Sequence, residues 1–345
     1  MARKYRFSFG PWNIHEGSDP FGPPVREPFP FDEKLKACRD LGFEGIQFHD
    51  DDVVPDITRY SASEVLTKAR EVKKRLEDLE LIPEFVAPRL WEDKRYVHGG
   101  FTSDNADERR AAIDRAVQSV EIAKEIGSNL MVLWLAREGT YIRESKDPVR
   151  AVDLLVDAIN RMLAADKSIK IAIEPKPNEP MDLSYIPTVG HAIGLAYLTD
   201  DPTRVGALVE SAHAILANLD PSDEMAYCLA HHKLYSVHLN DQNSLKYDQD
   251  KAFGSANLRR AFDQVRVLEQ AGYGRNGEFV GFDIKVQRTQ PREKSFDHLT
   301  SSRANFELLV EKCRTLDEKK VEEYKAARDH EGLDHYIIRH LLGSA

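Results

Sequence analysis

Short apolar runs alternate with longer amphipathic segments along the whole chain. The segments 109–126, 148–164, 222–231 and 258–271 place apolar residues at i, i+3 and i+4, the spacing of a helix with one buried face. Eight strand-then-helix units in succession are what a closed parallel barrel requires, so the pattern predicts an α/β protein with a (β/α)8 TIM barrel. The apolar runs cover residues 5–12, 45–49, 83–87, 129–135, 169–174, 205–210, 234–239 and 278–284.

The C-terminal stretch has a different pattern. Beyond Leu316 the chain is strongly charged at 317–323 and then becomes apolar at positions within 336–342. This predicts a barrel domain over residues 1–315 and a short C-terminal helical arm over residues 316–345. Such an arm either contacts another subunit or folds back on its own barrel, and the pattern leaves both readings open.

Polar residues appear abruptly at the C-terminal ends of several apolar runs. Glu174 and Glu210 are the last residues of their runs, and His238 and Asp283 lie close to the ends of theirs. In a parallel barrel these ends share one face, which is the face where active sites are built. We therefore expect these four side chains to converge.

The types and spacings of these residues indicate a metal site. Glu210 and His213 are three residues apart, which places them on the same side of a helical turn. Asp248 and Asp250 are two residues apart in a polar loop, where carboxylates also commonly cap helices. An oxygen-rich set with few imidazoles suits Mg²⁺, Mn²⁺ or Co²⁺ better than structural zinc.

Three further features point to sugar chemistry or proton transfer. His49 precedes three acids, and a histidine hydrogen-bonded to Asp52 could move protons near neutral pH, although such acids also cap helices. Lys176, framed by prolines, could stabilise a developing oxyanion or simply pair with Glu174. Aromatic side chains near strand ends can wall a sugar pocket, although most aromatics are core: these are Trp12, Trp91 and Trp134.

Composition and charge narrow the class of protein. The 345 residues are 41% hydrophobic and carry a net charge of −10, and no cluster of Lys and Arg with interleaved aromatics offsets it. We therefore expect no nucleic-acid partner. No run approaches a membrane span, and the N-terminus lacks an apolar signal core, so we expect no membrane partner and a cytoplasmic location. The three cysteines form no CxxC pair.

Several longer strings occur in one order along the chain. They are Phe48-His49-Asp50-Asp51-Asp52, Gly99-Gly100-Phe101-Thr102, Trp134 with Arg137-Glu138-Gly139, residues 173–180, Pro187-Thr188-Val189-Gly190-His191, residues 246–250, and Phe282-Asp283 with Lys285. Sequence motifs of that length in that order are highly specific for one protein family. Together they resemble xylose isomerase of the shorter, actinobacterial-type class, from Phe9 to Leu316.

The resemblance implies two divalent metal ions per subunit, Mg²⁺, Mn²⁺ or Co²⁺, and no organic cofactor. The first ion would be held by Glu174, Glu210 and Asp283, and Glu210 would bridge to the second ion. The second ion would be completed by His213, Asp248 and Asp250.

The resemblance also implies an activity, the conversion of D-xylose to D-xylulose and of D-glucose to D-fructose. His49, oriented by Asp52, would assist ring opening, and Lys176 would donate to the C1 oxygen while a hydride shifts from C2 to C1. The assembly would be a homotetramer or a dimer. The pocket would be walled by Trp12, Trp91 and Trp134, with Phe21 reaching in from a neighbouring subunit.

One position departs from the family pattern. Where the family has Asp in a string of the form His-x-Asp-Leu-Asn, this chain has His238 as a ligand of the first metal. The exchange removes one negative charge and favours Mn²⁺ or Co²⁺ over Mg²⁺. Related sugar isomerases such as rhamnose isomerase resemble this chain in that histidine.

Alternatives on the same barrel therefore stay open. They are an isomerase or epimerase of another sugar and a non-catalytic sugar-binding barrel. A DNA-repair endonuclease would need more metal-binding histidines and a basic face, which the charge of the chain opposes.

Overall fold

Eight parallel strands close into a barrel in the computed structural model, which describes residues 5–17 and 22–343. Neighbouring strands follow the order β1-β10-β9-β8-β6-β4-β3-β2, and every pair is parallel. The predicted (β/α)8 barrel is thus confirmed. The strands are β1 (Arg6–Phe9), β2 (Gly45–His49), β3 (Ile82–Ala87), β4 (Leu130–Trp134), β6 (Lys170–Glu174), β8 (Val205–Glu210), β9 (Leu234–Leu239) and β10 (Phe279–Phe282).

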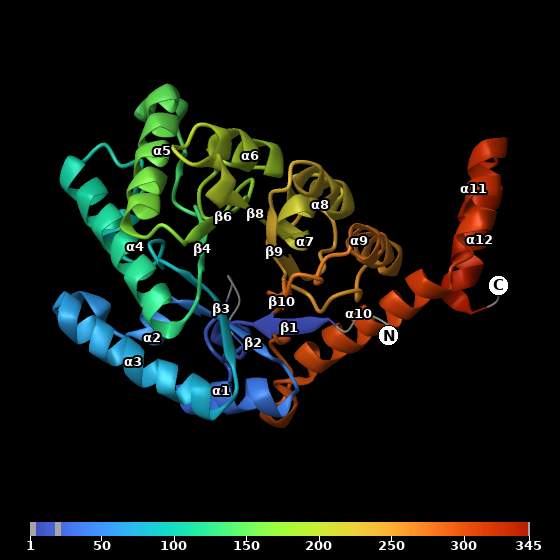
Figure 1. Cartoon of the computed structure of the whole chain (residues 1–345), viewed down its shortest axis with the longest axis horizontal. Coiled ribbons are helices and arrows are strands. Elements are labelled where there is room, and N and C mark those ends of the chain that lie inside the picture. The colour runs from blue at the N-terminus through green and yellow to red at the C-terminus, as the bar shows by residue number, and fades with distance from the viewer. Residues whose placement is uncertain (1–4, 18–21, 344–345) are drawn as a thin grey trace.

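Helices surround the barrel, one after each strand (Figure 1). This outer layer consists of α1 (Phe31–Asp40), α3 (Ala62–Asp78), α4 (Ala106–Ile126), α5 (Pro148–Ala165), α6 (Val189–Tyr197), α8 (Pro221–Ala230), α9 (Leu258–Ala271) and α10 (Asp297–Thr315). Two short helices, α2 (Asp50–Val53) and α7 (Ser211–Leu216), follow directly after β2 and β8. A small antiparallel pair, β5 (Gly139–Thr140) and β7 (Leu183–Ser184), joins the loops that follow β4 and β6.

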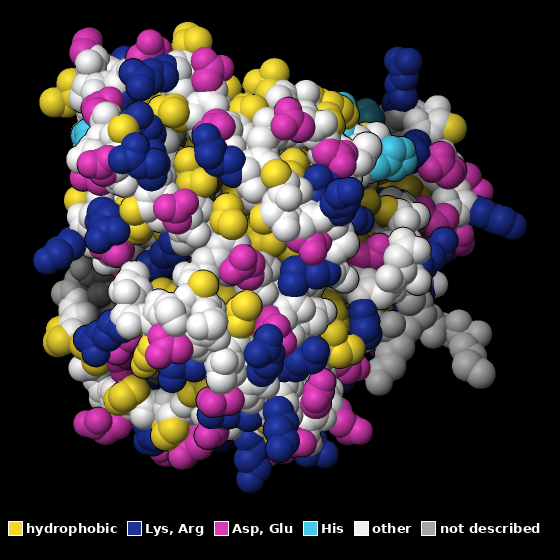
Figure 2. All heavy atoms as spheres, turned by 60° about the vertical axis from the view of Figure 1, so that its left-hand side comes forward, with side chains coloured by type: hydrophobic (Ala, Val, Ile, Leu, Met, Phe, Trp, Pro, Cys, Tyr) yellow, Lys and Arg dark blue, Asp and Glu magenta, His cyan; other side chains and the backbone are white. Residues whose placement is uncertain are grey.

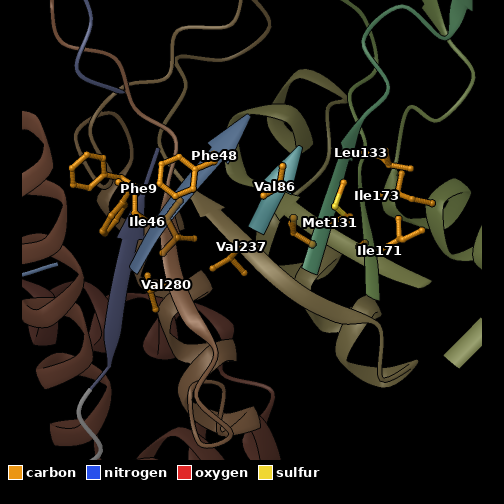
Figure 3. Packing of buried hydrophobic residues seen from close by; sticks show 14 of the residues in the cluster. Phe9, Ile46, Phe48, Val86, Met131, Leu133, Ile171, Ile173, Val237 and Val280 are labelled. Carbon is orange, nitrogen blue, oxygen red and sulfur yellow. The ribbon is translucent and has the colours of Figure 1, made fainter. Parts of the chain in front are cut away.

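The main core lies between the strands and the surrounding helices. Apolar side chains of alternate strand residues form one buried cluster with apolar residues of the helices. Figure 3 labels members of this cluster from β1, β2, β3, β4, β6, β9 and β10. The apolar runs of the sequence therefore correspond to strands whose outer side chains are covered by helices.

The inside of the barrel has a polar level and an apolar level. Phe85, Ala87, Val132, Ala172 and Leu208 form a small separate apolar cluster. A buried polar cluster, which we call the inner polar cluster, accompanies it and contains Ser8, Gln47, Glu84 and Ser236.

The barrel is irregular between β2 and β3. Ile46 pairs with Pro83 and Phe48 pairs with Val86, so that two residues of β3 oppose the single residue Gln47. This β-bulge directs two consecutive side chains of β3, Glu84 and Phe85, toward the barrel interior, as their contacts with Gln47 and His238 show.

Two C-terminal helices, α11 (Glu318–Ala327) and α12 (His330–Leu342), follow α10 and extend beyond the ring of helices (Figure 1). They contact their own chain, because Nζ of Lys312 donates to the carbonyl of His340 at 2.8 Å and Arg266 pairs with Glu318 at 2.8 Å. The predicted C-terminal helical extension is confirmed, whereas the domain boundary after residue 315 stays a prediction.

The surface carries mixed charges. On the face that Figure 2 displays, Lys and Arg side chains are interspersed with Asp and Glu. Within residues 5–17 and 22–343, no helix combines the length and the apolar character that crossing a bilayer requires.

Candidate metal centre

Four neighbouring strands end at one buried cluster of acidic and histidine side chains. Glu174 and Glu210 are the last residues of β6 and β8, and Asp283 directly follows β10. His238 of β9 is in register with Glu210 on one side and with Gly281 of β10 on the other. The predicted convergence of these four residues is therefore what the strand register produces.

The four side chains surround a common point, which we call the first cation group. Nδ1 of His238 lies 3.5 Å from a carboxylate oxygen of Glu210 and 3.8 Å from oxygens of Glu174 and Asp283. This nitrogen is buried and has no hydrogen-bond partner in the described part of the chain. A divalent ion held about 2.1 Å from each ligand keeps neighbouring ligand atoms roughly 3.0–3.4 Å apart, so a small contraction would complete a coordination shell.

A second cation group lies beside the first. Ligand atoms of Glu210, Asp248 and Asp250 lie within 4.8 Å of one another. Nε2 of His213 is 3.2 Å from Glu210 and 3.3 Å from Asp248. Glu210 belongs to both groups, which is the position that a bridging ligand requires, and the bridging role that the resemblance implies for it stays a prediction.

Two lysines partner the carboxylates of the second group. Nζ of Lys176 lies 2.7 Å from Asp248, and Nζ of Lys285 pairs with Asp250. Burial by itself lowers the pKa of Lys176, but the Asp248 carboxylate raises that pKa above the ordinary lysine value. The expected pairing of Lys176 with a carboxylate is thus present, with Asp248 rather than Glu174 as its partner.

The cluster carries an excess of negative charge in a desolvated place. Burial and the neighbouring Asp248 carboxylate raise the pKa of Asp250 well above its usual range. Burial likewise raises the pKa of Glu210. Such shifts arise where carboxylates crowd without enough cations, and a bound divalent ion would relieve them. The cluster contains more carboxylates than lysines. The two lysines are Lys176 and Lys285, and the five carboxylates are Glu174, Glu210, Asp248, Asp250 and Asp283.

The donor set fits a divalent cation. Carboxylate oxygens dominate, and each group can add one imidazole nitrogen. Nδ1 of His213 and Oδ1 of Asp248 are also buried without hydrogen-bond partners among the described residues. The structure therefore contains a buried acidic and histidine cluster that can hold a divalent ion.

A cavity of about 370 Å³ opens above the cluster and is walled by aromatic rings on its other side. The rings form a continuous chain, with centroids 4.3 Å apart for Trp12 and His49, 5.1 Å for His49 and Trp91, and 4.5 Å for Trp91 and Trp134. Nε1 of Trp12 donates to Asp283 at 3.0 Å, which joins the aromatic wall to the first cation group.

His49 is held by two competing partners. Its Nδ1 lies 3.1 Å from Asp52, as the sequence predicts, and 2.6 Å from Nη2 of Arg89. A guanidinium can only donate, so Nδ1 faces a donor and an acceptor at once. Of the other two acids after His49, Asp50 pairs with Arg115, whereas Asp51 pairs with the same Arg89 that contacts His49 and Asp52.

All predicted site residues within the described ranges gather at this cavity. Asp52 lies behind His49, and the others line the cavity itself. Phe21 lies outside the described residues, so its predicted place in a neighbouring pocket stays a prediction. The residues brought together are Trp12, His49, Trp91, Trp134, Glu174, Lys176, Glu210, His213, His238, Asp248, Asp250 and Asp283.

Sequence reasoning missed four charged residues that line the cavity, Arg89, Glu92, Glu179 and Lys285. A signal existed for Lys285, because it follows Asp283 at the same spacing as Lys176 follows Glu174. Arg89 also had a positional signal, since it lies just beyond the end of β3.

The fold and the cluster define a (β/α)8 barrel with a buried acidic and histidine cluster, able to hold a cation, at the C-terminal ends of its strands. The chain belongs to the xylose isomerase-like TIM barrel family, because residues 35–299 match that family.

Solved structures of similar fold include sugar epimerases. The chain is similar to 3-keto-D-glucoside 4-epimerase from E. coli in its apo form, with 16% identity, 87% of this chain and 100% of that chain covered, and a TM-score of 0.60. It is similar to a D-tagatose 3-epimerase-like protein, with 14% identity, 89% of this chain and 99% of that chain covered, and a TM-score of 0.63. It is also similar to D-psicose 3-epimerase in the presence of D-fructose, with 12% identity, 88% of this chain and 99% of that chain covered, and a TM-score of 0.64. At these identities the likeness establishes the fold alone.

Proposed function

We propose that this protein is a metal-dependent sugar isomerase or epimerase, which rearranges hydrogen on carbons next to a sugar carbonyl. The observation that carries the proposal is the first cation group, Glu174, Glu210, His238 and Asp283, at the floor of an aromatic-walled cavity. Membership of the xylose isomerase-like family and the fold shared with sugar epimerases support the same class of substrate.

The cavity provides two kinds of contact for a sugar. Its size falls within the range of small-molecule sites, about 300–1,000 Å³. Trp91 and Trp134 offer flat faces that pack against C–H groups, while the carboxylates and Lys176 offer partners for hydroxyl groups. A divalent ion held by the first cation group would act as a Lewis acid that stabilises negative charge on sugar oxygens.

The first candidate reaction is aldose–ketose isomerisation, for example D-xylose to D-xylulose or D-glucose to D-fructose. It is favoured by the second cation group and by the buried ammonium of Lys176, which can donate to a developing oxyanion. His49, with Asp52 and Arg89 at Nδ1, presents its other ring edge for proton transfer during ring opening.

The second candidate reaction is epimerisation next to a ketone, and a specific observation favours it. Lys176 and Lys285 already pair with Asp248 and Asp250 of the second cation group. Of the two cation groups, the first is therefore the one whose ligand atoms do not pair with a lysine. Glu174 and Asp283 come from the two outer strands of the four, so they approach from different sides and could serve as base and acid.

A single experiment in D₂O separates the candidates. Metal-stripped protein would be supplied with Mg²⁺, Mn²⁺ or Co²⁺ and a panel of xylose, glucose, rhamnose, fructose and other ketohexoses, and products followed by NMR. A hydride shift gives a ketose without solvent deuterium, whereas epimerisation through proton abstraction gives a product with deuterium at the inverted carbon. Conversion of no sugar by a protein that still binds sugars would leave a sugar-binding barrel.

The proposed setting is a cytoplasmic homo-oligomer, a dimer or a tetramer, as the resemblance implies. Light scattering of the purified protein checks the assembly, and the mass of a single chain would contradict it.

A further inference from the structure

A buried carboxylate lies beneath the metal centre and takes no part in either cation group. Glu84 accepts hydrogen bonds from the hydroxyls of Ser8 and Ser236, the latter at 2.7 Å, and from Nε2 of Gln47 at 3.0 Å. All three donors are neutral, so they do not cancel its negative charge. A carboxylate is costly to bury, and a neutral side chain could satisfy the same hydroxyls, which suggests that the charge has a purpose.

Glu84 fixes the orientation of the Gln47 amide. An ionised carboxylate only accepts hydrogen bonds, so the amide group that faces it must be the NH₂ group. The same NH₂ group lies 3.1 Å from the hydroxyl of Ser8. The carbonyl oxygen of Gln47 is consequently the atom that points at His238, 3.2 Å from Nε2.

Gln47 in turn fixes the tautomer of His238. Its carbonyl oxygen only accepts, so Nε2 of His238 must carry a hydrogen. In the neutral imidazole the lone pair is then on Nδ1, the nitrogen that faces Glu174, Glu210 and Asp283. A lone pair aimed at three carboxylates is repelled unless a proton or a metal ion lies between them.

The backbone makes room for this chain of contacts. The β-bulge in β3 sets both Glu84 and Phe85 opposite Gln47. At Gly281, a Cβ atom would lie 2.5 Å from Nε2 of Gln47 and 3.3 Å from Cδ2 of His238, so a larger residue would push into the contact between them. Two independent features of the strands thus preserve the same arrangement.

We propose that Glu84, acting through Gln47, is a positioning residue that holds His238 as the Nε2–H tautomer and makes Nδ1 its metal-binding atom. The inference rests on the first cation group of the proposed function but not on any sugar being turned over. The charge of Glu84, which acts through Gln47, also raises the basicity of the ligating imidazole. Loss of such outer partners typically costs about 10–100-fold in metal affinity.

Metal binding to the stripped protein tests the proposal directly. Titration calorimetry with Mn²⁺ would compare the parent with Glu84→Gln, a variant of the same shape without the charge. We expect the dissociation constant to rise about 10–100-fold. The exchange variant Gln47→Glu with Glu84→Gln returns a carboxylate to the Nε2 side of His238, and we expect it to recover most of the affinity.

The matched control is Ser236→Ala, which removes one hydrogen bond to Glu84 and leaves the contact between Glu84 and Gln47 intact. We expect its Mn²⁺ affinity to stay within about threefold of the parent, because Glu84 keeps its charge and its other donors, and the lost hydrogen bond is separated from the ion by Glu84, Gln47 and His238. Equal losses in Ser236→Ala and Glu84→Gln would show general loosening of the barrel and overturn the proposal. Melting temperatures in excess chelator identify any variant that fails to fold.

A direct reading of the tautomer completes the test. In protein with ¹⁵N-labelled histidine and with Mg²⁺, a diamagnetic ion, in place of the paramagnetic Mn²⁺, the ring signals of His238, assigned by their absence in His238→Asn, should show hydrogen on Nε2 and metal on Nδ1. Metal on Nε2, or an unchanged Mn²⁺ affinity in Glu84→Gln, would overturn the inference. A parent protein that binds Mn²⁺ but converts no sugar would refute the proposed function alone.

Discussion

The two halves of the barrel mouth differ in what they present to the cavity. The two cation groups lie at and just beyond the ends of β6, β8, β9 and β10. The aromatic wall lies at and just beyond the ends of β1 to β4 and consists of Trp12, His49, Trp91 and Trp134. The acidic half can fix oxygen atoms through a cation, and the aromatic half can pack against carbon and exclude water. The difference indicates a division of labour, in which one half holds the ion and the other holds the sugar.

The two halves also contact each other through polar side chains. Trp12 donates to Asp283 at 3.0 Å, and Nζ of Lys176 lies 5.2 Å from the centre of the Trp134 ring. The division is therefore a hypothesis that substitutions can break. Among the residues that line the cavity, effects on metal affinity should be confined to the acidic half, and effects on apparent sugar affinity should be strongest in the aromatic half.

The largest effect is expected for Glu210→Gln, because Glu210 contributes to every group of ligand atoms in the cluster. We expect the Mn²⁺ dissociation constant to rise about 100-fold or more and sugar conversion to fall by a larger factor, since a direct ligand matters more than an outer partner. Titration calorimetry measures the Mn²⁺ dissociation constant, and the NMR assay measures sugar conversion.

The control for this change is Glu92→Gln in the other half. Glu92 lines the cavity but pairs with Arg89, and its side chain is 63% exposed. We expect its metal affinity to stay within about twofold, because exposed ion pairs contribute little. A large loss of metal affinity in Glu92→Gln would contradict a division between the halves.

The next largest effect is expected for Lys176→Gln. Loss of the buried ammonium removes a donor that can stabilise an oxyanion, which typically costs about 10²–10³-fold in kcat. Metal affinity should stay the same or increase, because Asp248 loses its competing partner. Lys285→Gln is the matched control, and because Lys285 is 45% exposed we expect a smaller loss. Equal losses would show that the lysines act only by neutralising Asp248 and Asp250.

A smaller effect is expected for Trp134→Ala in the aromatic half. The loss of one packing face should raise KM about tenfold, a value that corresponds to roughly 1.4 kcal/mol, with kcat changed less. The Mn²⁺ affinity should not change. Trp134→Phe keeps an aromatic face and should restore most of the sugar affinity, whereas a kcat effect equal to that of Lys176→Gln would place Trp134 in the chemistry.

How far the sequence predicts this molecule differs from one element to another. Runs 45–49, 205–210 and 234–239 coincide with β2, β8 and β9, because buried parallel strands are apolar along their whole length. Run 5–12 is longer than β1, because Pro11 cannot donate to the strand ladder and begins a turn instead.

The metal-binding candidates could be named from sequence because they lie at strand ends, where a barrel brings distant residues together. Gln47 and Glu84 could not, since their meeting depends on the register shift between β2 and β3. The position of Arg89 beyond β3 could be anticipated, but its contact with His49 depends on a side-chain conformation that spacing does not determine.

The smallest and most discriminating change is His238→Asp, which tests why this chain has an imidazole beside three carboxylates. A fourth carboxylate would add negative charge and remove the nitrogen ligand, so we expect the preference for Mn²⁺ over Mg²⁺ to fall several-fold. Affinity for both ions should also decrease somewhat, because the shorter side chain leaves the carbonyl of Gln47 without its donor. The measurement is the ratio of the two dissociation constants, with melting in excess chelator as the folding control. An unchanged ratio would mean that the carboxylates alone set the choice of ion, and that the histidine serves the inner polar cluster more than the metal.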